Sequence, residues 1–563
     1  MRLASLAVPV SVVVCAIAAA CGSAGGGGGE PLDPQPDSGP AADVAPDVAF
    51  DAPPSADAPT STGPYDDFPT APYLDGDPAA GGKAPASAPT LFGPAGSGAA
   101  SGGPCLAEPE AGSLFPRNWL RPRFRMIAGA GQNLFEVRLH TSAEKRDLVA
   151  YTTAPIWTMP ADVWKGLQTH AVDVPITMTV RGATYDAASG KLTGGPSVGT
   201  SGTFTIAPAD AAGTIVYWML PSGAGETSNL KGFTVGDETV TEVLKPAQIG
   251  SACIGCHTST PDGTYVAVSS SDNPGDGSGS AWMEIRSLKD PTSGPPFMTA
   301  NAKSLLARKD QHGPAFSKAH WVGGDHVALT GFPVAGKTEI VWTDLESTAP
   351  DLGKGWGVLP RTGDANAAGG ANWSHDGSKV VYFSAPAIGA GVIDGAGQSD
   401  LFVVPYADKK GGAATKLYGD PAFSSYYPQF SADDQLVAFN RVARGQSSYN
   451  AASAEVFVVP ASGTGAPTRL LANDPPACTA QKSPGITNSW PKWSPKATPS
   501  GTKTYYWLTF SSTRGAGNPQ IYVTGVVVDG GVVTTYPALY LWNQPAAEHN
   551  HTPAWDVFSL PIH

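Results

Sequence analysis

The sequence predicts an all-β chain in which a β-sandwich domain is followed by a six-bladed β-propeller. Its 67 glycines and 53 prolines among 563 residues suit a turn-rich β protein. From residue 113 onward, short alternating or β-branched runs are separated by Gly, Asp, Pro and Ser, as expected for short strands. In the second half of the chain one such unit recurs about every 50 to 65 residues, which indicates repeated sheet units packed side by side.

Residues 1–21 are predicted to be an export signal. Arg2 precedes a short apolar stretch that ends in small residues, and this stretch is too short for a stable membrane span. The letters AAAC, which end at Cys21, resemble a bacterial lipobox, although Ala stands where the usual Leu would be. The resemblance implies that Cys21 carries lipid and tethers the chain to a membrane of the cell envelope, on the periplasmic side or the outer surface of the outer membrane. The alternative is an ordinary secretory signal, and either signal places the chain where disulfides form.

Residues 22–112 are predicted to form a disordered linker. They hold 13 acidic residues against the single basic residue Lys83, so nearly all of the net charge of −13 lies here. A stretch so rich in Gly, Ala and Pro buries too little apolar surface to fold, and its like charges extend it. No basic stripe occurs along the chain, which argues against nucleic acid as a partner.

Residues 113–212 are predicted to form the sandwich. Runs such as RFRMIAG, NLFEVRLHTS and VPITMTVRGATYD alternate in polarity and are separated by turn residues. The length of the segment and the spacing of its strands resemble an immunoglobulin-like or fibronectin-like module.

The repeat occupies residues 213–563. An aromatic or small residue, a Ser-x-Asp-Gly turn and an alternating strand recur, and a second apolar strand follows each copy. One unit cannot bury both of its faces, whereas several units packed radially can. The clearest copies are WSHDGSKVVYFSA (373–385), FSADDQLVAFNRV (430–442) and STPDGTYVAVSSS (259–271), with looser copies at 321–332 and 493–512.

These strings resemble the TolB-type propeller repeats of exported bacterial proteins, a resemblance that implies a propeller and says little about function. A sixth copy, HTPAWDVFSLP, begins at residue 551, and the printed sequence provides one strand of it. Apolar runs at 213–221, 231–237 and 239–245 precede the first copy. We therefore expect the last blade to combine strands from both ends of the propeller segment.

The cluster CIGCH brings Cys253, Cys256 and His257 together just before the first repeated strand. It resembles the haem-attachment motif of cytochromes c, in which two thiols bind the haem and the adjacent His binds its iron. The resemblance implies a c-type haem held by these three residues. The repeat register places the cluster at the innermost strand of a blade, facing the central channel.

Two other interpretations of the cluster stay open. Cys253 and Cys256 form a disulfide or remain thiols, or the cluster holds another metal, although no second Cys or His pair at zinc spacing is present. For a haem iron, His551 in the neighbouring blade is the expected second ligand. His549, His312 and His320 are weaker candidates, and any one of these histidines alone is more simply a loop residue.

The predicted function is electron transfer or redox sensing in the cell envelope, with a redox or scaffold protein as partner. The alternative is a non-enzymatic scaffold that binds protein or glycan, with Cys253–Cys256 as a structural disulfide. No Ser/His/Asp arrangement can be argued from spacing, so the sequence favours a protein that is not an enzyme. The two remaining mature cysteines, Cys105 and Cys478, are expected to pair and to hold the N-terminal segment against the propeller.

Overall fold

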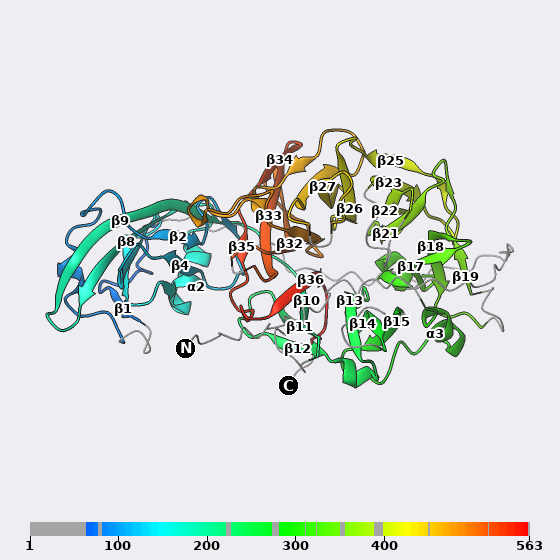
Figure 1. Cartoon of the computed structure of the whole chain (residues 1–563), viewed down its shortest axis with the longest axis horizontal. Coiled ribbons are helices and arrows are strands. Elements are labelled where there is room, and N and C mark those ends of the chain that lie inside the picture. Colours follow the sequence, from blue (N-terminus) through cyan, green and yellow to red (C-terminus); the bar gives the residue numbers. More distant parts are fainter. Residues whose placement is uncertain are drawn as a thin grey trace, which may run out of the picture.

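The computed structural model describes residues 63–76, 82–220, 227–272, 281–309, 311–322, 324–348, 355–387, 398–448, 451–515 and 517–560. The predicted signal with Cys21, and residues 22–62 of the predicted linker, lie outside the described residues. The described chain is mostly β-structure, as predicted, with 48% strand and 8% helix. Figure 1 shows an N-terminal part at the left and a larger group of sheets at the right.

Two sheets and a helix form the N-terminal part. Phe124 of one sheet and Phe135 of the other belong to one buried cluster, to which Trp164 of the helix also contributes. The immunoglobulin-like or fibronectin-like assignment stays a prediction. The first sheet has the order β1 (Tyr73–Asp75), β6 (Leu148–Thr152), β5 (Leu134–His140), β8 (Ile176–Asp186), β9 (Lys191–Ile206), β3 (Leu114–Phe115); the second has β2 (Cys105–Glu108), β4 (Arg123–Ile127), β7 (Ile156–Thr158); the helix is α2 (Ala161–His170).

The second half of the predicted linker is instead part of this fold. β1 pairs in parallel with β6 and forms one edge of the first sheet, and the short helix α1 (Ala88–Phe92) buries Phe92. Phe68 is also fully buried. The prediction of disorder was wrong for residues 63–76 and 82–112 because composition was averaged over a long stretch. A few apolar side chains are enough to dock a Gly- and Pro-rich segment on an existing sheet.

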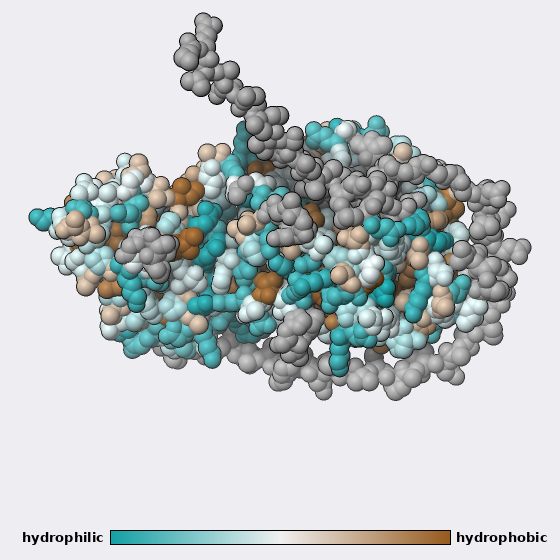
Figure 2. Space-filling model, turned by 60° about the horizontal axis from the view of Figure 1, so that its bottom comes forward, coloured by the Kyte–Doolittle hydropathy of each residue, from teal (hydrophilic) through white to brown (hydrophobic). Residues whose placement is uncertain are grey.

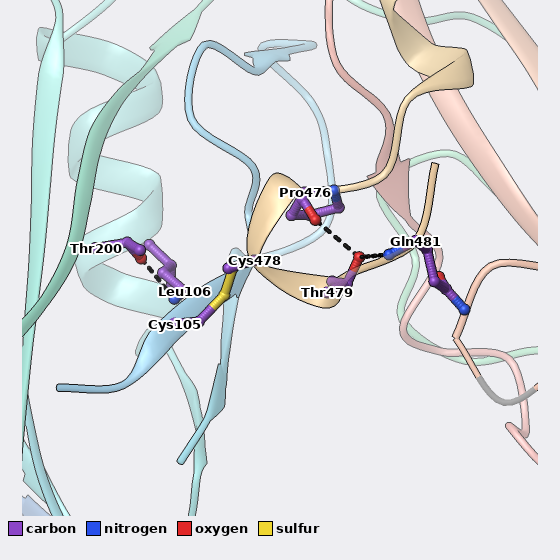
Figure 3. The surroundings of a disulfide bond; sticks show 7 residues. All are labelled: Cys105, Leu106, Thr200, Pro476, Cys478, Thr479 and Gln481. Carbon is purple, nitrogen blue, oxygen red and sulfur yellow. Dashed lines mark hydrogen bonds between the residues drawn. A yellow bond between two sulfur atoms is a disulfide. The ribbon is translucent and has the colours of Figure 1, made fainter. Parts of the chain in front are cut away.

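The predicted disulfide between Cys105 and Cys478 is confirmed, with 6.1 Å between their Cα atoms. Figure 3 shows it joining β2 to the short turn η6 (Ala477–Thr479) of the larger part. Beside it the backbone N–H of Leu106 donates to Thr200 Oγ1 at 2.7 Å. The bond therefore links two segments separated by 373 residues in sequence.

The larger part consists of sheets that each begin with a strand of the repeat. In three of these units the turn after the first strand is closed by a hydrogen bond from a Ser or Thr side chain to an Asp two residues later, for example from Ser374 Oγ to Asp376 Oδ1 at 2.6 Å. The strand orders are β13 (Cys253–Ser259), β14 (Tyr265–Ser271), β15 (Ala281–Ser287); β16 (His312–Ala315), β17 (Val327–Val334), β18 (Lys337–Asp344), β19 (Trp356–Val358); β21 (Ala367–Trp373), β22 (Lys379–Ala385), β23 (Asp400–Pro405), β25 (Thr415–Tyr418); β26 (Phe423–Phe430), β27 (Leu436–Ala443), β28 (Glu455–Pro460), β29 (Thr468–Arg469); and β30 (Asn488–Trp493), β32 (Lys503–Ser512), β33 (Gln520–Asp529), β34 (Val532–Thr535).

One further sheet joins the two ends of the repeat region. Its order is β12 (Thr241–Leu244), β11 (Asn229–Thr234), β10 (Thr214–Leu220), β36 (His549–Asp556), and Trp218 of β10 lies opposite His551 of β36. Each of these six sheets has one terminal strand that faces the middle of the group, which we call its first strand. The first strands contact one another in the cyclic order β13, β16, β21, β26, β30, β36 and back to β13. This is a propeller-like arrangement (Figure 1).

The surface is mainly polar. Figure 2 shows that hydrophobic residues on the face in view lie in small separate patches among hydrophilic ones. None of the helices in the described part of the chain is long and apolar enough to cross a membrane.

Candidate functional site in the central cavity

A cavity of about 360 Å³ lies among the first strands of the sheets. Its volume falls within the range of small-molecule sites. The lining residues Lys318, His375 and Val557 are exposed and mark the mouth of the cavity. The lining residues Tyr427 and Trp490 are buried.

A bulge in each first strand shapes this cavity. In β26 and β30 the pairing register shifts between Tyr426 and Gln429 and between Ser489 and Lys492. Within these bulges Tyr427 and Trp490 have φ values of 54° and 59°, which non-glycine residues rarely adopt. Their rings stack with centroids 4.1 Å apart and an interplanar angle of 11°. A bulge redirects a side chain, and here it brings two large aromatic rings to the cavity wall.

The CIGCH cluster lies on β13, and Cys256 and His257 line the cavity as expected. Cys253 does not line it. Its thiol is buried and free, with Sγ 3.6 Å from Ser228 Oγ, and burial raises its pKa. The alternative of a Cys253–Cys256 disulfide is therefore wrong. The physical reason is that the Cys253 side chain lies against Ser228, whereas Cys256 lines the cavity.

His257 is buried between backbone carbonyls. Its Nδ1 lies 3.2 Å from the carbonyl oxygen of Gly255, and its Nε2 lies 3.1 Å from that of Val216. Burial lowers the pKa of His257 to about 4, so the ring is neutral at pH 7 and has one N–H to donate. Either nitrogen would have to leave its carbonyl before it could bind a metal.

His551, the expected second iron ligand, is also buried, and this lowers its pKa to about 3. Its ring lies 6.1 Å from that of Trp218, and it is not a lining residue of the cavity. Among the weaker candidates, His320 contacts Asp325 and the Gly377 carbonyl, each at 2.9 Å. His549 is half-buried, and the side chain of His312 lies outside the described residues.

The residues as placed do not fit a haem bound by the cluster. Covalent attachment needs both thiols to reach one ring while the adjacent His faces the iron. Here Cys253 lies toward Ser228, and both nitrogens of His257 face carbonyls. Within the described ranges no three His, Cys, Asp or Glu side chains converge as a metal site. The haem roles of Cys253, Cys256, His257 and His551 therefore stay predictions.

Lys492 is the cavity residue that sequence reasoning missed. It follows the bulge of β30 and lines the cavity, and its ammonium has no hydrogen bond or ion pair with any described residue. Burial lowers its pKa to about 8, against the opposing influence of Asp556, whose own pKa is raised by burial. The sequence signal was a lysine between two tryptophans, in the string SWPKW on an inner strand.

Asn372 of β21 and Gln429 of β26 occupy the same position after the bulge as Lys492 does in β30. Both of their side chains already form hydrogen bonds within the protein. Asn372 Nδ2 donates to the Pro428 carbonyl at 2.9 Å. Gln429 Oε1 accepts from the Trp493 backbone N–H at 3.1 Å. Of these three polar residues that follow a bulge, Lys492 is the one whose head group is left to interact with a ligand.

Comparison with known proteins yields only distant structural similarity. No protein-family model and no curated protein matches the chain. A solved structure from a study of two prolyl endopeptidases is 15% identical, covers 58% of this chain and 48% of its own, and has a TM-score of 0.29. A puromycin-hydrolyzing peptidase of Mycobacterium tuberculosis is 13% identical, with 59% and 54% covered and a TM-score of 0.28. This chain thus spans about half the length of these two proteins.

Proposed function

We propose that this protein is a non-enzymatic binding protein whose central cavity takes a small anionic ligand. The observation that carries the proposal is the Lys492 ammonium, which faces the cavity without a hydrogen bond or an ion pair among the described residues. Lys492 is partly buried, and burial of a cation is costly unless an anion and hydrogen bonds accompany it. A ligand carboxylate at this position would supply both.

The stacked rings of Tyr427 and Trp490 indicate the rest of the ligand. Both rings belong to the wall that Lys492 shares, and flat apolar faces bind sugar rings or other flat bodies well. An acidic sugar combines such a ring with a carboxylate. We therefore infer that the ligand belongs to the acidic carbohydrates, which develops the glycan-binding alternative expected from the sequence.

The test compares glucuronate with glucose, because the two differ by the carboxylate. Isothermal titration calorimetry of the full chain should detect glucuronate binding and much weaker glucose binding. Lys492→Met should weaken glucuronate binding at least tenfold. The matched control is Lys496→Met, since Lys496 is an exposed lysine four residues away that does not line the cavity. Equal affinities in both variants and the unchanged protein would overturn the proposal.

The proposed architecture is a six-bladed propeller closed by strands from both chain ends and preceded by a sandwich. The cyclic contacts of the first strands and the pairing of β36 with β10 support the closure. We also propose that the protein is exported and anchored through lipid on Cys21. Metabolic labelling with radioactive palmitate tests the anchor, because a Cys21→Ser variant should lose the label.

A second candidate function is electron transfer or redox sensing with a c-type haem and a redox partner protein. One observation favours it: Cys256 and His257 line the same cavity. It requires Cys253 to leave Ser228, His257 to leave the Val216 carbonyl, and Cys256, which is disulfide-bonded, to be reduced. Visible spectra of protein made in a host with a haem-attachment system decide the question, because a folded colourless product excludes this candidate. If covalent colour does form, Cys256→Ala should abolish it.

A further inference from the structure

The same bulge recurs in all six first strands around the cavity. In each one, two residues of the first strand lie opposite a single residue of the neighbouring strand. In cyclic order, the leading residues of the six bulges are Gly255, Gly313, Gly370, Tyr427, Trp490 and Thr552. Three neighbouring strands therefore have glycine at this position, and the other three have a side chain.

This difference divides the cavity wall into two unlike halves. Tyr427, Trp490 and Thr552 bring their side chains to one half. On the other half, β16 and β21 line the cavity with residues that have a short apolar side chain or none. We call this set the glycine wall: Gly313, Pro314, Ala315, Gly370 and Ala371. Because glycine leaves the backbone uncovered, a ligand can approach these strands closely.

Gly313 is the position at which the glycine wall is open. A Cβ added at Gly313 would meet no described atom within 4 Å, whereas one added at Gly370 would lie 3.1 Å from the Phe383 ring. The backbone at Gly313 does not itself exclude a side chain. Its φ of 63° is close to the values of 54° and 59° that Tyr427 and Trp490 adopt. The space beside Gly313 is therefore left open because the residue there is glycine.

The glycine wall lies opposite Lys492. In the cyclic order of the six first strands, β16 stands three places from β30 in either direction. A sugar with its carboxylate at Lys492 and its ring against Trp490 would therefore leave the space beside Gly313 unfilled. The cavity volume of about 360 Å³ falls in the range of sites for drug-sized ligands, which are larger than one sugar ring.

The glycine wall also leads to the mouth of the cavity. Phe316, Ser317 and the exposed Lys318 follow Ala315 along the chain, and they line the cavity as well. A saccharide that begins at Lys492 can thus continue along this wall toward solvent. Pro314 and Ala315 present an apolar surface, which suits the C–H face of a sugar ring.

We propose that the glycine wall is a second sugar subsite, so that the ligand is an acidic oligosaccharide with a terminal uronic acid. The inference rests on the proposed function, because the first residue is the one whose carboxylate meets Lys492. The second ring would lie against Pro314 and Ala315 and would fill the open space beside Gly313. Further residues of the saccharide would extend through the mouth of the cavity.

The test compares two ligands of equal charge by isothermal titration calorimetry of the full chain. One is methyl β-glucuronide, and the other is a β-1,4-linked disaccharide with glucuronate at its non-reducing end and glucose as its second residue. The disaccharide should bind at least about tenfold more tightly, because it alone reaches the glycine wall. Equal affinities would overturn the second subsite and leave the proposed function standing. Failure of both ligands to bind would overturn the proposed function and the subsite together.

Two protein variants make the test specific. Gly313→Tyr places an aromatic ring in the second subsite, so it should abolish the gain from the second residue. Its affinity for methyl β-glucuronide should stay unchanged, which also shows that the variant is folded. The control is Gly336→Tyr in the turn between β17 and β18, because Gly336 has a φ of 79° and open space at its Cβ but does not line the cavity. A gain that persists in Gly313→Tyr, or that is lost in both variants, would overturn the proposal.

Discussion

The buried ion pair between Arg181 and Glu136 holds the segment that composition alone assigned to a disordered linker. Both side chains are 2% exposed, and Arg181 Nη2 lies 2.6 Å from Glu136 Oε2. Arg181 Nη1 also donates to the carbonyls of Phe92, Pro94 and Ser97, each at 2.9 Å. One guanidinium thus joins β8, β5 and the segment after α1.

We expect Arg181→Met to destabilise the N-terminal part by about 3–5 kcal/mol, because it removes the two close hydrogen bonds from Arg181 to buried Glu136 and leaves only Arg138, whose Nε lies 3.5 Å from Glu136 Oε1. For a part of this size, 1 kcal/mol lowers the melting temperature by about 2–4 °C, so its calorimetric transition should fall by about 6–20 °C. The control is Arg117→Met, which removes an ion pair whose Arg117 and Asp210 side chains are 46% and 50% exposed. That variant should cost at most about 1 kcal/mol.

Calorimetry of the full chain measures both variants, and limited proteolysis reports whether residues 82–97 become accessible. The double variant Arg181→Met with Glu136→Met should recover part of the loss, since no buried charge is then left alone. If Arg181→Met and Arg117→Met lower the melting temperature equally, the buried pair does not hold this segment and the reasoning is refuted.

Three further predictions concern the cavity and the cysteines. Glucuronate affinity should stay constant from pH 6 to 7 and fall about tenfold per pH unit above the Lys492 pKa of about 8, since only the protonated ammonium attracts the carboxylate. Calorimetric titrations between pH 6 and 10 measure this profile. An affinity that does not change with pH would contradict the prediction. Cys253 should resist iodoacetamide at pH 8 in the folded protein and react after unfolding, because burial raises its pKa; mass spectrometry detects the adduct, and rapid labelling of folded protein would contradict it. Replacing Cys105 and Cys478 together by Ala should lower the free energy of unfolding by about 2–5 kcal/mol in denaturant titrations, and an unchanged midpoint would show that the disulfide adds no stability.

The large-scale features could be predicted because they follow from pattern. The Ser-x-Asp-Gly turns and alternating strands indicate a propeller, and the single strand after residue 549 indicates pairing with a strand near residue 214. β36 does pair with β10. The position of the CIGCH cluster at the cavity follows from the same register, and Cys256 and His257 do line it.

The details of the site could not be predicted because they depend on bulges. Counting along an ideal strand places Cys253 and Cys256 on opposite faces, but it cannot show that Cys253 lies against Ser228 or that Cys256 faces the cavity. It also cannot show that Tyr427 and Trp490 adopt positive φ and stack, or that Lys492 is left without a partner. These features arise from contacts between blades that are far apart in sequence.

The central claim is that Lys492 binds the anionic group of a cavity ligand. A crystal structure of the protein soaked with glucuronate tests this claim most directly. We predict density for the sugar in the cavity, with its carboxylate within hydrogen-bond distance of Lys492 Nζ and its ring against Trp490 or Tyr427. A sugar bound outside the cavity, or a cavity that stays empty at saturating glucuronate, would contradict the claim.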